Sequence, residues 1–185
     1  MTIEAWKILN SSVVFDNPWC RVRQDAVQLA NGAIVPDYFV NVRPDIALVL
    51  PITVEGEVIF VRQYRHGVQQ VLLELPAGTF DRAQEDSYQA AARELEEETG
   101  YVASHWRKLA TLYDNPVKDT NQIHLFLAQN AVPQGQQALD PTENLEIVLI
   151  PSPEIARNIA TGEICVAGSL AALYLAQSHL PFSRL

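Results

Sequence analysis

The chain has 185 residues, 48% of them hydrophobic, which suits one domain of ordinary size with an additional segment. Its formal net charge of −9 and isoelectric point near 4.8 argue against a protein that binds duplex DNA or RNA through a basic groove. Its two cysteines lie far apart in the sequence, and we expect both thiols to be reduced. No apolar run is long enough to cross a membrane, and the N-terminus lacks a secretory signal, so we expect a soluble, cytoplasmic protein.

Residues 1–42 are expected to form an N-terminal antiparallel β segment. Strand-like runs separated by turn formers occupy residues 12–15, 21–29 and 34–42. The aromatic residues Trp6, Trp19 and Tyr38 suit either packing or stacking on a nucleobase, and packing is the more common role. Because such an arm has little of its own to bury itself against, we expect it to be a dimerisation segment of a homodimer, with residues 43–185 forming the main domain.

The main domain is expected to begin with a hairpin of two apolar strands, Asp45–Val54 and Glu57–Arg62. Arg62 and Arg65 follow three residues apart, so on an ideal strand they face opposite sides. They would converge on one diphosphate only if the chain bends before Gly67; otherwise each would form a surface ion pair. His66, beside that glycine, is expected to be a loop residue and not a base.

A helix is predicted to begin near Asp86 or Ser87 and to end at Gly100. The two polar residues can cap the first amide groups, and glycine tolerates the left-handed conformation of a helix C-terminus. A periodic set of apolar residues predicts its buried face: Tyr88, Ala91, Ala92 and Leu95.

Three carboxylates of this helix, Glu94, Glu97 and Glu98, share one edge, whereas Glu96 points elsewhere. Like charges at these spacings repel one another unless a cation lies between them. The cluster therefore predicts either a Mg²⁺ or Mn²⁺ site or, as a bare acidic run more often is, a solvated helix face.

The residues before and within the helix resemble the Nudix box, Gly-x5-Glu-x7-Arg-Glu-U-x-Glu-Glu-x-Gly-U, where U is apolar or aromatic. The matching residues are Gly78, Glu85, Arg93, Glu94, Leu95, Glu97, Glu98, Gly100 and Tyr101. One spacing differs, because six residues and not five separate Gly78 from Glu85, and Gln84 occupies the strict position. The extra residue falls in the loop, so the spacing of the helical carboxylates is unchanged.

An Arg-Gln-Tyr-Arg run before Glu-Leu-Pro-Ala-Gly is similar to the ADP-ribose pyrophosphatase branch of this family. The resemblance implies an α/β/α sandwich with a mixed central sheet. It also implies Mg²⁺ or Mn²⁺ bound by a set of box residues: the carbonyl of Ala77, Glu94, Glu97, Glu98 and, through water, Glu85. Arg93 would orient Glu97 by an ion pair, and Arg62 and Arg65 would contact the substrate.

Downstream of the helix, strands are expected at 106–113 and 122–128, followed by a polar loop, a strand ending at Ile150, and helices at about 152–161 and 168–178. Pro116 matches by position a proline of this branch and would contact the substrate. The resemblance also implies an additional acidic residue after the box, Glu143 or alternatively Glu146. Glu143 or Glu97 would be the general base.

These residues together predict metal-dependent hydrolysis of a nucleoside diphosphate linked to another moiety, with ADP-ribose cleaved to AMP and ribose 5-phosphate as the favoured reaction. The rival substrates are a nucleotide sugar, a dinucleoside polyphosphate or an oxidised nucleotide. A non-hydrolytic module that senses nucleotides is the alternative from another class, and the complete set of box acids disfavours it.

Overall fold

The computed structural model describes residues 3–139 and 143–179, and the chain divides into two compact units. One unit comprises residues 1–44 together with 113–122, and the other comprises 45–112 and 123–185. The segment 113–122, which the sequence places in the main domain, therefore groups with the N-terminal residues. Within the described part of the chain, no helix combines the length and apolarity that crossing a membrane requires.

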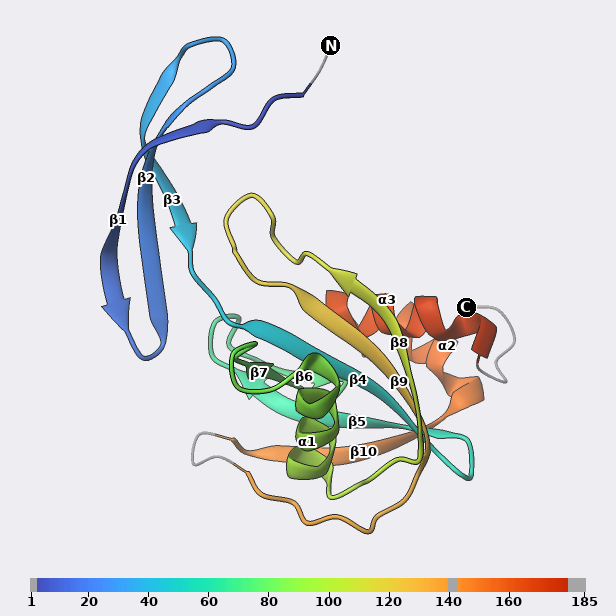
Figure 1. The fold of residues 1–185 in the computed structure, drawn as a ribbon. Coiled ribbons are helices and arrows are strands. Elements are labelled where there is room, and N and C mark those ends of the chain that lie inside the picture. The colour runs from blue at the N-terminus through green and yellow to red at the C-terminus, as the bar shows by residue number, and fades with distance from the viewer. Residues whose placement is uncertain (1–2, 140–142, 180–185) are drawn as a thin grey trace. The chain divides into compact units, whose positions relative to one another are not determined.

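The first unit is built on a three-stranded antiparallel sheet of order β1-β2-β3 (Figure 1). Its strands are β1 (Lys7–Asn17), β2 (Cys20–Gln28) and β3 (Ile34–Asn41). Every residue of β1 is exposed, and this strand is longer than its alternating pattern predicted. Trp6 and Tyr38 pack edge to face, with ring centroids 5.5 Å apart, which favours the packing interpretation for this pair.

The second unit contains a mixed seven-stranded sheet of order β10-β5-β4-β9-β8, in which β6 pairs with β5 and β7 pairs with β4. The strands are β4 (Asp45–Thr53), β5 (Glu57–Arg65), β6 (Gln70–Glu74), β7 (Ala77–Phe80), β8 (His105–Leu112), β9 (Ile123–Ala131) and β10 (Leu145–Pro151). Strands β4 and β9 are parallel.

The predicted hairpin of β4 and β5 is paired only at its turn, at Ile52 and Val58. Beyond that point the two strands separate, because β4 pairs with β7 and β5 pairs with β6. The sequence did not predict β7, since its four residues, Ala77-Gly78-Thr79-Phe80, include two with weak strand propensity. This short strand places the start of the box against the centre of the sheet.

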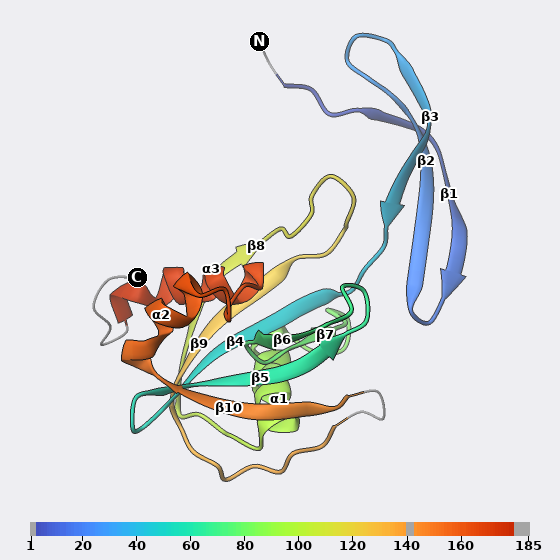
Figure 2. The same ribbon diagram turned by 180° about the vertical axis from the view of Figure 1, so that it is seen from behind.

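Helices cover both faces of this sheet, which confirms the predicted α/β/α sandwich. Helix α1 (Ser87–Thr99) packs on one face, and α2 (Ile155–Ala160) and α3 (Ala167–Ala176) pack on the other (Figures 1 and 2). Short 3-10 turns, Ser152–Glu154 before α2 and Gln177–His179 after α3, complete the C-terminal helices. Two hydrophobic clusters, one on each face, form the core.

The ends of α1 agree with the sequence prediction. The side chain of Asp86 accepts hydrogen bonds from the first amide groups in a capping box with Gln89, and Gly100 has the left-handed conformation, with φ 69°. The predicted buried face was partly wrong, because Tyr88 is 47% exposed. Its ring packs on the edge of Trp106, with centroids 5.3 Å apart.

The buried face of α1 contains the predicted Ala91 and Leu95 together with further small and acidic residues. Its buried members are Ala90, Ala91, Glu94, Leu95, Glu98 and Thr99. Apolar periodicity could not indicate all of this face, because two of its members are carboxylates. Their burial is the first sign that the acidic run is more than a solvated helix face.

Candidate active site

A polar cavity of about 200 Å³ lies between β7, the middle of α1 and the chain on both sides of residues 140–142. It is lined by Gly78, Thr79, Arg93, Glu94, Glu97, Ala138 and Glu143. The cavity therefore brings residues of the box together with the acidic residue expected downstream of it.

Arg93 links three carboxylates of the box. Its Nη1 donates to Glu94 at 2.7 Å and to Glu97 at 2.8 Å, while Nη2 and Nε donate to Glu85 at 2.7 and 3.3 Å. These hydrogen bonds, those to Glu85 first, raise the pKa of Arg93. The expected ion pair between Arg93 and Glu97 is present, and Glu85, not Gln84, is the residue before the helix that pairs with Arg93.

Glu94 and Glu98 are 7% and 4% exposed, respectively. Burial raises the pKa of Glu94 above its ordinary value, against the opposing effect of Arg93. Burial and the neighbouring charge of Glu94 raise the pKa of Glu98 to about 8, although the amide of Ala77 donates to Glu98 Oε2 at 3.1 Å. Ionising both Glu94 and Glu98 costs free energy, because the two charges are buried and repel each other. A cation placed beside the two carboxylates would offset both the burial cost and the repulsion.

Gly78 lies close against the carboxyl group of Glu94. A Cβ atom at this position would approach that carboxyl group to 2.0 Å, so only glycine leaves room for it. Among the described residues, no three His, Cys, Asp or Glu side chains converge into a complete metal site. The donor set nevertheless fits Mg²⁺ or Mn²⁺, because such ions take a few carboxylates and complete their coordination with water and substrate phosphates. The roles predicted for Glu85, Glu97 and the Ala77 carbonyl as metal ligands stay predictions.

The structure distinguishes the two downstream glutamates. Glu143 lines the cavity, and its charge contributes to the raised pKa values of Glu94 and Glu98. Glu146, on β10, pairs with Arg62 at 3.0 Å. The sequence offered both, and only tertiary structure brings Glu143 to the box.

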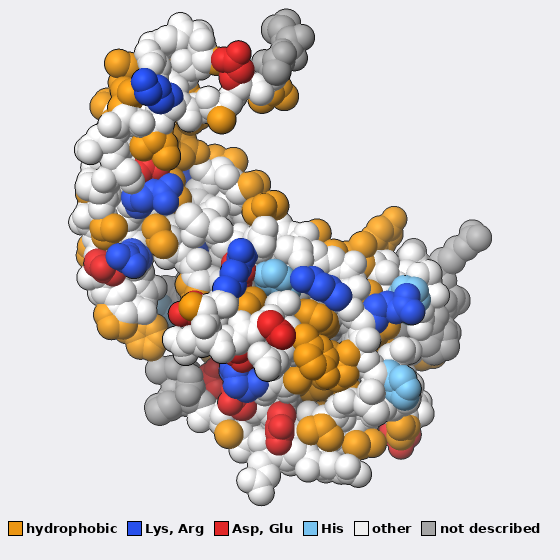
Figure 3. Space-filling model, viewed as in Figure 1, with side chains coloured by type: hydrophobic (Ala, Val, Ile, Leu, Met, Phe, Trp, Pro, Cys, Tyr) orange, Lys and Arg blue, Asp and Glu red, His pale blue; other side chains and the backbone are white. Residues whose placement is uncertain are grey.

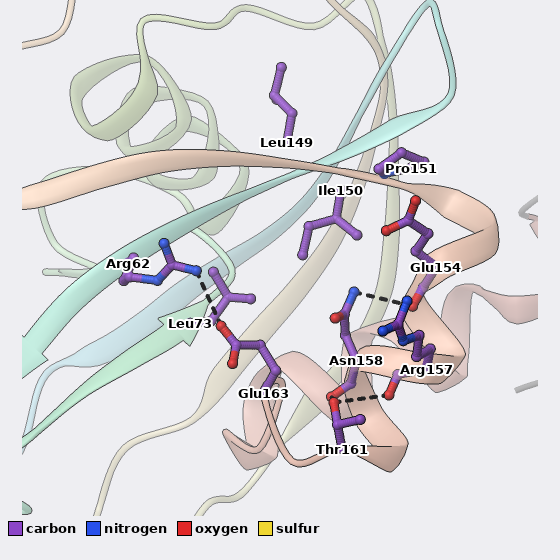
Figure 4. Close-up of a pocket in the computed structure, with 10 residues that line it drawn as sticks. All are labelled: Arg62, Leu73, Leu149, Ile150, Pro151, Glu154, Arg157, Asn158, Thr161 and Glu163. Atoms are coloured by element: carbon purple, nitrogen blue, oxygen red, sulfur yellow. Dashed lines mark hydrogen bonds and ion pairs between the residues drawn. The ribbon is translucent and has the colours of Figure 1, made fainter.

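Arg62 and Arg65 both lie on β5, which ends at Arg65, and their side chains bind different carboxylates. Arg62 binds Glu146 and Glu163 and lines a separate open cavity of about 330 Å³ beside β10 and α2 (Figure 4). Arg65 donates through Nε to Glu74 at 2.8 Å, and its charge opposes the raised pKa of Glu98. Arg65 is therefore near the box, whereas Arg62 lies with the other cavity.

Pro116 lies in the segment 113–122, which belongs to the N-terminal unit, and its predicted substrate contact stays a prediction. His66 is exposed and follows β5, as expected of a loop residue, with Nδ1 3.4 Å from the Tyr64 hydroxyl.

Two features of the site escaped sequence reasoning. Gln63 lies on β5 between Arg62 and Tyr64, and its buried Oε1 has no hydrogen-bond partner among the described residues. The Gln137 side chain donates to the carbonyl of Glu98 at 2.8 Å, and the Ala138 amide donates to that of Glu97 at 2.9 Å. These two bonds cap the C-terminal end of α1 and tie the chain that leads to Glu143 onto the box helix. No local pattern marks either feature.

Comparison with known proteins agrees with this geometry. Residues 42–164 match the model of the NUDIX domain, and residues 6–41 match that of the nucleoside diphosphate sugar hydrolase N-terminal domain. The chain is 30% identical to an ADP-ribose pyrophosphatase of Bacillus subtilis, covering 85% of each protein. It is 34% identical to an ADP-ribose pyrophosphatase of Mycobacterium tuberculosis, over 81% of this chain and 74% of that protein.

The fold is similar to the crystal structure of an ADP compounds hydrolase, with a TM-score of 0.84 and 25% identity over 97% of this chain and 96% of the other. Enzymes of the NUDIX family generally use divalent metal ions. Because the domain model covers well over half of the chain and the relatives match most of its length, the chain belongs to the NUDIX family and is a Nudix hydrolase similar to ADP-ribose pyrophosphatases.

Proposed function

We propose that this protein hydrolyses ADP-ribose to AMP and ribose 5-phosphate with the help of Mg²⁺ or Mn²⁺. The observation that carries the proposal is the cavity in which Glu143 meets Arg93 and the carboxylates of the box. The choice of ADP-ribose rests on the names of the relatives and on the Arg-Gln-Tyr-Arg run of residues 62–65.

Hydrolysis of a diphosphate requires water to attack a phosphorus atom that is shielded by negative oxygens. A bound divalent ion supplies neutralisation of that charge. Glu94 and Glu98, helped by Glu97 and the Ala77 carbonyl, would hold it, and Glu85 would bind through water. Arg93 holds the carboxylates of Glu94 and Glu97 beside one another by donating from Nη1 to both, which offsets their mutual repulsion and fixes their orientation.

The general base takes a proton from the attacking water. Glu143 and Glu97 are the candidates, since both line the cavity, and Glu97 also accepts a hydrogen bond from Arg93 at 2.8 Å. Arg65, close to Glu98 and Glu74, would contact the phosphates. Arg62 would have to leave Glu146 and Glu163 to do so.

The direct test incubates the purified protein with Mg²⁺ and a panel of substrates, and measures the products by chromatography. The panel contains ADP-ribose, a nucleotide sugar, a dinucleoside polyphosphate and an oxidised nucleotide. We expect AMP and ribose 5-phosphate in equal amounts from ADP-ribose, with the highest kcat/KM of the panel. No turnover of any compound would refute hydrolysis and favour a nucleotide-sensing module.

A nucleotide sugar is the second candidate substrate, favoured by the match of residues 6–41 to the nucleoside diphosphate sugar hydrolase N-terminal domain. In the same panel, a higher kcat/KM for a nucleotide sugar than for ADP-ribose would establish it.

We also propose that residues 1–42 mediate a homodimer. Hydrophobic side chains lie exposed along the N-terminal strands, among them Val13, Val14 and Phe15 of β1 (Figure 3). The expected mass in analytical ultracentrifugation at micromolar concentration is that of two chains. Phe15→Asp should shift the equilibrium toward monomer, whereas Val54→Asp, at an equally exposed position of the main unit, should not. A monomeric wild-type protein would contradict the proposal.

A further inference from the structure

A polar cluster that the catalytic proposal does not use lies where β4 and β9 begin. Asp45 is 6% exposed and His124 is 9% exposed, and His124 Nε2 lies 3.0 Å from Asp45 Oδ2. On the other side of the ring, Nδ1 lies 3.1 Å from Lys108 Nζ and 3.3 Å from Thr111 Oγ1. Because an ammonium group only donates, Nδ1 is the acceptor, and Nε2 carries the hydrogen toward Asp45.

Arg82 joins this cluster from the loop between β7 and α1, where its Nε donates to Asp45 Oδ2. The loop itself is compact, because the Asp81 side chain accepts from the Ala83 amide at 2.9 Å and the Asp81 carbonyl accepts from the Glu85 amide at 3.1 Å. One end of the turn is thus bound to the sheet through Arg82. The other end is Glu85.

Glu85 in turn accepts two hydrogen bonds from Arg93, the residue that holds Glu94 and Glu97. The six residues 79–84 between Gly78 and Glu85 are also one more than the box pattern contains, and four of them follow β7. A longer loop has more freedom, and a second attachment to the sheet removes that freedom.

We propose that Arg82 is a positioning residue for the metal site. Its bond to Asp45 anchors the lengthened loop, so that Glu85 stays against Arg93, and Arg93 keeps Glu94 and Glu97 in the arrangement that binds the divalent ion. The inference rests on the proposed metal-dependent function and adds a route from the sheet to the box carboxylates.

The Arg82 side chain is 59% exposed, so its removal takes little buried surface from the core. Asp45 keeps its bond to His124 when Arg82 is absent. We therefore expect Arg82→Ala to melt about 2–6 °C below the wild type, since the buried Asp45 carboxylate loses one partner and keeps His124. A purely structural role would change the melting temperature and leave metal affinity unchanged, so the two readouts separate the roles.

The test titrates each protein with Mn²⁺ in the absence of nucleotide and measures free Mn²⁺ by electron paramagnetic resonance. Arg82→Ala and Arg82→Gln should raise the dissociation constant about 10-fold, a typical effect of losing a residue that supports metal ligands. Arg82→Lys, which keeps a cation able to reach Asp45, should restore part of the affinity. The matched control is Gln84→Ala in the same turn, whose side chain donates to Asp81 at 3.4 Å, and it should bind Mn²⁺ as the wild type does.

A double-mutant cycle tests the route. Asp45→Asn should weaken Mn²⁺ binding as Arg82→Ala does, and the double variant should be no weaker than either single one. Unchanged affinity in both Arg82→Ala and Arg82→Gln would overturn the inference, and additive effects in the cycle would overturn the route through Asp45. Failure to hydrolyse ADP-ribose would contradict the proposed substrate alone, because Mn²⁺ binding is measured without it.

Discussion

Replacing Glu98 by glutamine tests the metal assignment through metal binding and through the stability of the metal-free protein. The carboxyl group is 4% exposed, accepts from the Ala77 amide and has a pKa of about 8. Glutamine has nearly the same shape, and its oxygen can accept the same hydrogen bond. The variant therefore removes a charge from the metal site and no packing from the core.

The electrostatic cost of this carboxylate sets the size of the expected effect on stability. A pKa raised from the ordinary 4.5 means that the folded, metal-free protein binds the proton more tightly than the unfolded chain. The contribution of Glu98 to the stability is therefore most favourable below pH 4.5 and is lost as the pH rises toward about 8. At pH 7 the loss amounts to about 3 kcal/mol, an order-of-magnitude figure, at 1.36 kcal/mol for each pH unit above 4.5.

We accordingly expect metal-free Glu98→Gln to melt about 6–12 °C above the metal-free wild type at pH 7, with the difference vanishing near pH 4. Mg²⁺ should stabilise the wild type and not the variant, and kcat/KM should fall at least about 100-fold. Calorimetry with EDTA or Mg²⁺ and a product assay make these measurements. Glu96→Gln is the matched control, since Glu96 lies on the same helix but accepts from the Gln136 amide. A near-wild-type rate with an unchanged Mg²⁺ requirement would refute the assignment.

Two further substitutions test the packing around the site. Gly78→Ala should lower Mn²⁺ affinity at least about 10-fold, because the new methyl group would displace the Glu94 carboxyl group. The control is Gly67→Ala, whose Cβ position has no atom within 4 Å. Equal Mn²⁺ affinities of the two variants would disprove the steric argument. Ser169→Ala should lower the free energy of unfolding, measured with urea, by about 1–3 kcal/mol. The reason is that the buried Leu75 amide loses its acceptor, the Ser169 hydroxyl at 2.9 Å. An unchanged unfolding midpoint would show that another group satisfies that amide.

The sequence alone determined those features that depend on neighbours along the chain. The limits of α1 follow from the capping residue Asp86 and the glycine at position 100, and the relative directions of Glu94, Glu97 and Glu98 follow from helical geometry. The spacing from Glu85 to Arg93 carried the family resemblance, and the ion pair between them is present in the fold.

Tertiary structure decided the features that depend on distant residues. Helical spacing does not say which face is buried, and it is the sheet beneath α1 that buries Glu94 and Glu98 and so raises their pKa values. Glu143 and Glu146 are the same residue type three positions apart, and only the path of the chain brings the first to the box.

The loop with the extra residue shows the same division. Its additional length is visible in the sequence, but nothing local indicates that Arg82 would reach Asp45, which lies 37 residues earlier and beside a histidine from another strand. Contacts of this kind form only when strands far apart in sequence become neighbours in a sheet, because burial, and not local propensity, gives a carboxylate such as Asp45 its need for partners.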